Sequence, residues 1–182
     1  MKKVILATLI TITACATQAK HRPLQIGLET GYQATDIDEP GFNEEYDNTT
    51  IGAQVGYEIQ VNDTLSVTPI AHFGTSVDND RIKTKLELER YVAFGTKFSV
   101  YDTAEQRLFF YAEPNYRYQK MNCTSKKTKT NSHLYLKHKG MGVKLGVGAF
   151  VTDNVMIDFS VSKHWMKTED VSHILLGVSY AL

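Results

Sequence analysis

Runs of about ten residues that alternate between apolar and polar side chains recur eight times along this chain. The last of them runs from Ser172 to Leu182, and its residues Ile174, Leu176, Val178, Tyr180 and Leu182 fall on one face. A period of two is typical of a β-strand, whose successive side chains point to opposite faces. The eight runs therefore predict an all-β chain of eight strands.

The predicted strands are separated by connections of two lengths. We expect strands over residues 24–32, 51–61, 65–73, 86–100, 108–120, 134–151, 155–162 and 172–182. Long connections then cover residues 35–48, 75–85, 120–133 and 167–171, and short ones cover 62–64, 101–107 and 152–154. Tight turns between neighbouring strands indicate antiparallel pairing. Pro69 and Pro114 fall inside strands, where each removes a backbone donor, so we predict a bulge or a missing hydrogen bond at each.

The first residues have the pattern of an export signal. Two lysines precede an apolar stretch from Val4 to Ala14, which is too short to cross a membrane as a helix. Small residues favour cleavage after Ala19, which makes residues 1–19 a signal peptide and residues 20–182 the mature domain. The sequence up to Cys15 also fits a bacterial lipoprotein signal, so a lipid anchor at Cys15 stays open as an alternative.

The charge balance and the cysteine count exclude several classes of function. The chain carries 20 basic and 20 acidic residues, which leaves no basic surplus for binding nucleic acid. Only Cys123 is certain to survive processing of the signal, and one cysteine cannot form an internal disulfide, so we expect none. The acidic residues from Asp36 to Glu39 are spaced too loosely for a calcium loop, and we expect neither a metal nor a cofactor.

The composition of the two strand faces favours a membrane barrel over a soluble one. The polar face is rich in glycine, serine and glutamine, which suit the narrow interior of an eight-stranded barrel. The apolar face carries aromatic residues near both ends of the strands, as at the two interfaces of a bilayer. These are Tyr32, Tyr116, Tyr118, Tyr135 and Trp165 near the long connections, and Tyr57, Phe98 and Tyr180 near the short ones. The sequence thus predicts an eight-stranded antiparallel up-and-down transmembrane β-barrel.

The eight strands, the glycines from Gly142 to Gly148 on the polar face and the terminal strand resemble the small outer-membrane barrels of the OmpA/OmpX type. The resemblance covers residues 20–182. It implies a place in the outer membrane of a Gram-negative bacterium and insertion by machinery that recognises the terminal strand. That strand usually ends in an aromatic residue in this family, whereas this chain ends in Leu182 with Tyr180 two residues before it. We expect a monomer.

Charged residues on the polar face are expected to meet inside the barrel. They are Glu29, Glu58, Lys97, Glu113, Arg117, Lys144 and Asp158, and His72 and His173 share their face. Because an unpaired buried charge costs several kcal/mol, we expect these groups to pair. The simplest interpretation is a polar plug, and the alternative is a gate whose groups exchange partners to open a narrow pore.

The long connections differ in charge. Residues 35–48 contain six acids and no base, whereas the stretch from Arg117 to Lys144 contains eight bases and no acid. On the outward face, Arg90, Lys137, Lys139 and Lys163 lie near the long connections, level with aromatic residues. Cations at that level suit the phosphates of lipopolysaccharide, so we predict a lipopolysaccharide contact there.

An enzyme must also be considered, because some small barrels modify lipid A. Ser162 and His164 are the best local pair for a hydrolase, but their face is the one that points into the lumen. We therefore predict a non-enzymatic outer-membrane barrel that serves envelope integrity or surface interaction through four long extracellular loops. A lipid A-modifying enzyme and a narrow gated channel are the alternatives.

Overall fold

The computed structural model describes residues 23–39, 42–77, 84–102, 107–125, 133–167 and 169–182. Nine strands follow one another along the chain: β1 (Leu24–Glu39), β2 (Phe42–Tyr57), β3 (Ile59–Asn62), β4 (Leu65–Ser76), β5 (Thr84–Tyr101), β6 (Leu108–Ser125), β7 (His133–Phe150), β8 (Val155–Met166) and β9 (Glu169–Ala181). The expected signal peptide with Cys15 lies outside the described residues, as do the side chains of Cys123 and Tyr135. The described part of the chain has no helix that is long and apolar enough to cross a membrane.

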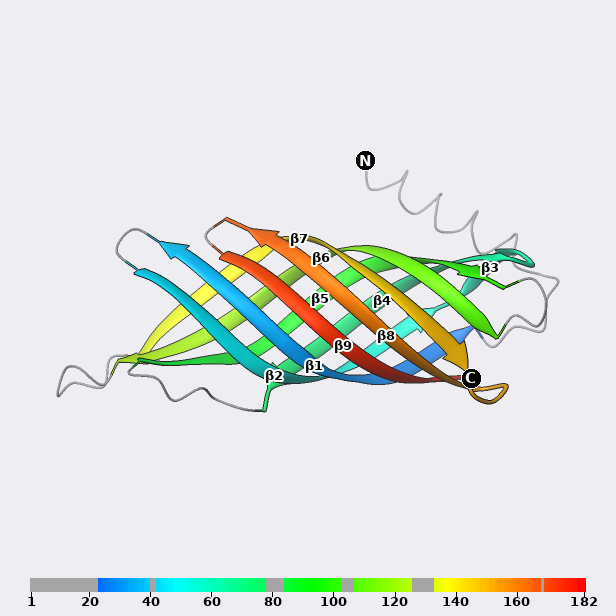
Figure 1. The fold of residues 1–182 in the computed structure, drawn as a ribbon, viewed down its shortest axis with the longest axis horizontal. Coiled ribbons are helices and arrows are strands. Elements are labelled where there is room, and N and C mark those ends of the chain that lie inside the picture. The colour runs from blue at the N-terminus through cyan, green and yellow to red at the C-terminus, as the bar shows by residue number, and fades with distance from the viewer. Residues whose placement is uncertain (1–22, 40–41, 78–83, 103–106, 126–132, 168) are drawn as a thin grey trace, which may run out of the picture.

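All the strands belong to one antiparallel sheet that closes on itself. Neighbours along the chain pair with each other, β9 returns to pair with β1, and β2 and β3 both pair with β4. Since β2 and β3 follow each other along the same side of β4, they fill one position in the ring, and the barrel has the eight strand positions that the sequence predicts. The strands run obliquely around the long axis of the barrel (Figure 1).

The stagger of the strands sets the width of the barrel. We followed the paired residues from strand to strand around the barrel, starting at Ile26 of β1. The path returns to β1 at Asp36, ten residues further along the chain. A ring of eight strands with this stagger has an interior that side chains just fill. Inside such a barrel, residues far apart in the sequence therefore come into direct contact.

The two ends of the barrel differ. The C-terminus lies at the same end as the β3–β4 and β7–β8 turns, where Ala181 donates its backbone N–H to the carbonyl of Asn154 at 2.8 Å (Figure 1). We call this the turn end. At the other end, which we call the distal end, β1 joins β2, β4 joins β5, β6 joins β7 and β8 joins β9.

The polar face of the long strands lies inside and the apolar face lies outside, as the sequence predicts. Gln33, Glu113 and Arg117 are at most 2% exposed, whereas Leu28 is 65% and Phe94 is 59% exposed. A soluble protein of this size would bury its large apolar side chains, so the reversed arrangement indicates a lipid solvent. The aromatic residues expected at the interfaces point outward wherever their side chains are described; they are Tyr32, Tyr57, Phe98, Tyr116, Tyr118, Trp165 and Tyr180.

Both prolines interrupt the ladder as the sequence predicts, each by a missing bond without a shift of register. The pairing of β5 with β6 has a gap opposite Pro114, between Gly95 and Phe98, although Pro114 pairs with β7 without a break. The pairing opposite Pro69 has a matching gap, which divides β2 from β3 at Glu58. In each case the gap includes the proline's own pair, because that pair needs a backbone N–H that proline lacks.

The expected long connections are wrong in extent, because the strands continue well into them. Strand β1 reaches Glu39 and β2 begins at Phe42, so most of the segment 35–48 is paired sheet. The other three segments are likewise shortened, with β4 reaching Ser76, β5 beginning at Thr84, β6 reaching Ser125, β7 beginning at His133 and β9 beginning at Glu169. The reason is that lipid requires apolar outward residues only inside the bilayer. Beyond it, pairing continues with outward polar residues such as Asp36 and Asp47, and the apolar alternation fades.

Candidate functional site

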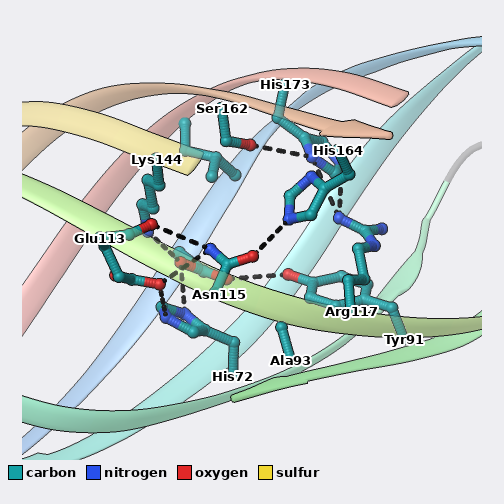
Figure 2. Close-up of a pocket in the computed structure, with 12 residues that line it drawn as sticks. His72, Tyr91, Ala93, Glu113, Asn115, Arg117, Lys144, Ser162, His164 and His173 are labelled. Atoms are coloured by element: carbon teal, nitrogen blue, oxygen red, sulfur yellow. Dashed lines mark hydrogen bonds and ion pairs between the residues drawn. The ribbon is translucent and has the colours of Figure 1, made fainter. Parts of the chain in front are cut away.

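Four ionisable side chains from four strands meet in the middle of the lumen. The His72 ring lies between two carboxylates, with Nδ1 3.3 Å from Glu29 Oε2 and Nε2 3.0 Å from Glu113 Oε1 (Figure 2). Lys144 donates to the same Glu29 oxygen at 3.0 Å. The other Glu29 oxygen accepts a hydrogen bond from the Tyr91 hydroxyl at 2.8 Å. This group, which we call the lumen cluster, satisfies each buried charge with at least one partner, as low-dielectric surroundings require.

Arg117 lies next to the lumen cluster and is held by neutral partners. Its guanidinium carbon is 4.0 Å from the centre of the Tyr91 ring, and its Nη2 donates to Gln33 Oε1 at 2.9 Å. Its Nη1 is 3.1 Å from Nδ1 of His173. Among the described residues, no carboxylate lies within ion-pair distance of Arg117. This buried cation is therefore stabilised by a ring face and by dipoles rather than by an ion pair.

The remaining three predicted lumen charges lie nearer the turn end. Lys97 donates to Gln25 Oε1 at 3.1 Å, and Gln25 donates in turn to Glu58 Oε2 at 2.7 Å. Asp158 accepts a hydrogen bond from the Tyr111 hydroxyl at 2.8 Å. The structure thus divides the seven predicted charges into two groups, and within them only Glu29 and Lys144 form a direct acid–base pair among the described residues.

The aromatic residues inside the lumen were not predicted from the sequence. Phe109 and Tyr111 are buried with Met156 and Ala181, and together they fill the interior near the turn end. A β-carbon added at Gly146 would overlap the Tyr111 ring, and one added at Gly148 would overlap the Phe109 ring. The signal was present in the sequence as two aromatic residues on the polar face of β6, beside a strand with four glycines on that face.

A small cavity remains between the lumen cluster and β8. It has a volume of about 20 Å³, and Figure 2 shows the side chains that point into it. Three buried atoms of its lining, Glu113 Oε2, Arg117 Nε and His164 Nδ1, have no partner among the described protein atoms. A polar space of this size suits one or two ordered waters that satisfy these atoms.

The residues considered for hydrolysis are not assembled as a catalytic pair. Ser162 Oγ is 3.4 Å from His173 Nδ1, whereas His164 Nε2 is 2.8 Å from Asn115 Oδ1. Both Ser162 and His164 are buried in the lumen, on the side of the wall away from lipid. Among the described side chains, no three histidine, cysteine or carboxylate groups are placed to hold a metal ion.

On the outer wall, three of the four predicted lipopolysaccharide contacts gather at the distal end. Lys120 of β6 lies opposite Arg90 of β5 on one side and opposite Lys137 of β7 on the other. Lys139, two residues beyond Lys137 on the same face, lies opposite Tyr118. We call Arg90, Lys120, Lys137 and Lys139 the basic band. Lys120 was not among the predicted contacts, although its alternation with Gln119 and Met121 marks it as outward.

The fourth predicted contact, Lys163, lies outside the basic band. It faces Val143 of β7, four residues along the strand from Lys139, and its Nζ pairs with Asp170 Oδ2 at 3.2 Å. Four residues of strand span about 13 Å, too far for one headgroup phosphate to contact both lysines.

A β-bulge in β5 places one member of the basic band. The register against β6 shifts between Leu88 and Arg90, so Glu89 is an extra residue. Strict alternation would turn Arg90 inward with Leu88, but the bulge turns Glu89 and Arg90 outward and returns Tyr91 to the lumen. The bulge therefore places Arg90 in the basic band on the outer wall. It also places Tyr91, whose ring contacts Arg117, in the lumen.

Comparison with known proteins shows what the chain is similar to. The model of the outer membrane protein beta-barrel domain family matches residues 4–181. Among solved structures, Neisserial surface protein A (NspA) is similar with a TM-score of 0.64 and 14% identity, over 87% of this chain and 97% of that one. Ail, the attachment invasion locus protein of Yersinia pestis in complex with the heparin analogue sucrose octasulfate, has a TM-score of 0.60 and 14% identity, over 87% and 98%.

A third similar structure is the N-terminal β-barrel domain of OprF from Pseudomonas aeruginosa, with a TM-score of 0.53 and 13% identity, over 86% of this chain and 97% of that one. Comparison with curated protein sequences finds no match. At these identities the solved structures show a shared fold alone.

Proposed function

Because the chain belongs to the outer membrane protein beta-barrel domain family, we propose that it is a non-enzymatic outer-membrane barrel whose basic band binds lipopolysaccharide. Through that contact it serves envelope integrity or surface attachment. The observation that carries the proposal is the row of cations formed by Arg90, Lys120 and Lys137 across three adjacent strands.

The place of the basic band suits a lipid headgroup. Its side chains lie on the outward wall, where Lys120 follows the outward aromatic residues Tyr116 and Tyr118 along β6 and Lys139 of β7 lies opposite Tyr118. Neighbouring strands are about 4.8 Å apart, so the three cations of the row repel one another unless an anion lies between them. Phosphate groups at the membrane surface supply that anion, and arginine and lysine bind them by charge-assisted hydrogen bonds.

A soluble polyanion is the second candidate ligand for the same cations. Ail, which shares the fold, is an attachment invasion protein that has been crystallised with a heparin analogue. A sulfated glycan would reach the basic band from the solvent side at the distal end. The outward direction of Lys137 and Lys139 along the wall favours the lipid ligand over the glycan.

The proposal is tested by neutralising two members of the basic band. Lys137→Gln with Lys139→Gln is expected to reduce the lipopolysaccharide that co-purifies with the barrel, measured by mass spectrometry of lipid A per mole of protein. The matched control is Lys163→Gln with Lys167→Gln, which removes the same charge from exposed lysines of the neighbouring segment. If the two double variants retain the same amount of lipopolysaccharide per mole of protein, the proposal is contradicted. Loss of heparin binding with unchanged lipopolysaccharide retention assigns the basic band to the glycan.

Two alternative functions receive less support from the geometry. A lipid A-modifying enzyme needs its nucleophile at the lipid face, and Ser162 is buried inside the barrel. An open channel needs a continuous lumen, and Phe109, Tyr111 and Met156 occupy it near the turn end. We therefore expect unchanged lipid A chemistry when the protein is expressed and no conductance steps in planar bilayers.

A further inference from the structure

One acidic side chain contacts the basic band directly. Glu89 Oε2 is 2.6 Å from Nζ of Lys120, the central cation of the row. We propose that Glu89 is the internal counter-ion of the basic band and that the phosphomonoester of a lipid headgroup displaces it from Lys120. This inference rests on the proposed function, because it concerns the same cations and names the chemistry of the headgroup that they select.

The geometry allows the Glu89 carboxylate to leave without disturbing the strand. The Glu89 side chain is 40% exposed, whereas that of Lys120 is only 18% exposed, so the acid is the more accessible member of the pair. The backbone of the bulge is fixed independently of that side chain. Thr75 Oγ1 donates to the Glu89 carbonyl at 2.8 Å, and Ser76 Oγ donates to the Leu88 carbonyl at 3.0 Å.

The charges of the basic band determine which ligand can compete with Glu89. No carboxylate among the described side chains lies within ion-pair distance of Arg90, Lys137 or Lys139, so Glu89 neutralises only the centre of the band. A phosphomonoester carries a charge of about −1.5 to −2 near neutral pH and offers three acceptor oxygens. It can therefore contact Lys120 and a flanking cation at once.

A phosphodiester headgroup is a weaker competitor for the same position. It carries a single negative charge, which is the same charge that Glu89 already supplies at Lys120. Replacing one singly charged anion by another adds little Coulomb energy at an exposed site. We therefore expect the basic band to prefer lipids with phosphomonoester headgroups, and Glu89 to be the residue that sets this preference.

The experiment compares two substitutions that each remove one negative charge beside a lysine. Glu89→Gln removes the acid that pairs with Lys120, and Asp170→Asn removes the acid that pairs with Lys163, which lies outside the basic band. Each full-length barrel is placed in nanodiscs that contain phosphatidic acid, a phosphomonoester, or phosphatidylglycerol, a phosphodiester. Bound lipid is counted by native mass spectrometry. Glu89→Asp shortens the acid without changing the net charge and serves as a second variant.

We expect Glu89→Gln to raise phosphatidylglycerol binding about two- to fivefold, as expected from the loss of one exposed ion pair, and so to narrow the preference for phosphatidic acid. Glu89→Asp should change binding in the same direction by less, and Asp170→Asn should leave it at the wild-type level. Equal effects of Glu89→Gln and Asp170→Asn overturn the inference. If the effects are equal but the double variant Lys137→Gln with Lys139→Gln still loses lipopolysaccharide, the proposed function stands and only the role of Glu89 is wrong.

Discussion

Glu29 of β1 and Lys144 of β7 form an ion pair of 3.0 Å across the lumen, although 115 residues separate them in the chain. Both side chains are at most 5% exposed. The pair exists only because the stagger of the barrel brings these two strands face to face. Breaking a buried pair leaves one charge without compensation, which costs far more than the pair itself contributes.

We predict that Lys144→Met lowers the free energy of unfolding by about 3–5 kcal/mol, because the buried Glu29 carboxylate loses its lysine and keeps only the His72 ring and the Tyr91 hydroxyl as partners. The measurement is urea unfolding of the barrel in detergent micelles, followed by the fluorescence of Trp165, the single tryptophan. The control is Lys163→Met, which breaks the exposed pair with Asp170 and should cost less than about 1 kcal/mol. Similar losses in the two variants would contradict a structural role for the lumen pair.

A second prediction concerns the gap in the ladder at Pro114. Pro114→Val restores an N–H opposite the Thr96 carbonyl and places a β-branched residue on the outward face. The restored bond should raise the free energy of unfolding by about 1 kcal/mol. The control is Ala112→Val, an outward position of the same strand where the ladder is intact. If Pro114→Val stabilises no more than this control, the proline does not leave a carbonyl unpaired.

The faces of the strands could be predicted from the sequence, whereas their ends and the lumen partners could not. Alternation is imposed by lipid on one side and by a narrow lumen on the other, so it is visible wherever a strand lies in the bilayer. It disappears around Asp36 and Asp47, where the strands stay paired but water surrounds them. The contact of Glu29 with Lys144 depends on the stagger of all the strands, which no local pattern records.

Lys120 was missed as a member of the basic band for the same reason, because its neighbours are set by the register of the strands. Arg90 and Lys137 were predicted as outward from their own strands, but their connection through Lys120 depends on two registers and on the bulge at Glu89. A bulge adds one residue without changing composition. The alternation of β5 therefore contains only a single irregular step, which lies inside the strand predicted over residues 86–100.

A third prediction tests the fit of the aromatic residues near the turn end. Gly146→Ala places a methyl group against the Tyr111 ring and should lower the free energy of unfolding by about 1–3 kcal/mol through overpacking. In a Tyr111→Leu background the same substitution should cost clearly less, because the ring that it strikes is gone. A double-mutant cycle measured by urea unfolding gives this coupling. If the two losses of unfolding free energy are additive, the absence of a side chain at Gly146 is not needed to accommodate the Tyr111 ring.

The last prediction concerns Arg117, which differs from Lys144 in having neutral partners. Its contacts are the Tyr91 ring, the Gln33 amide oxygen and the His173 ring. Arg117→Met removes a buried cation without leaving an acid unpaired, so the desolvation recovered offsets the lost hydrogen bonds. We expect the free energy of unfolding to change by less than about 1.5 kcal/mol, measured in parallel with Lys144→Met. A loss as large as that of Lys144→Met would mean that the acids of the lumen cluster depend on Arg117 over a distance longer than a direct contact.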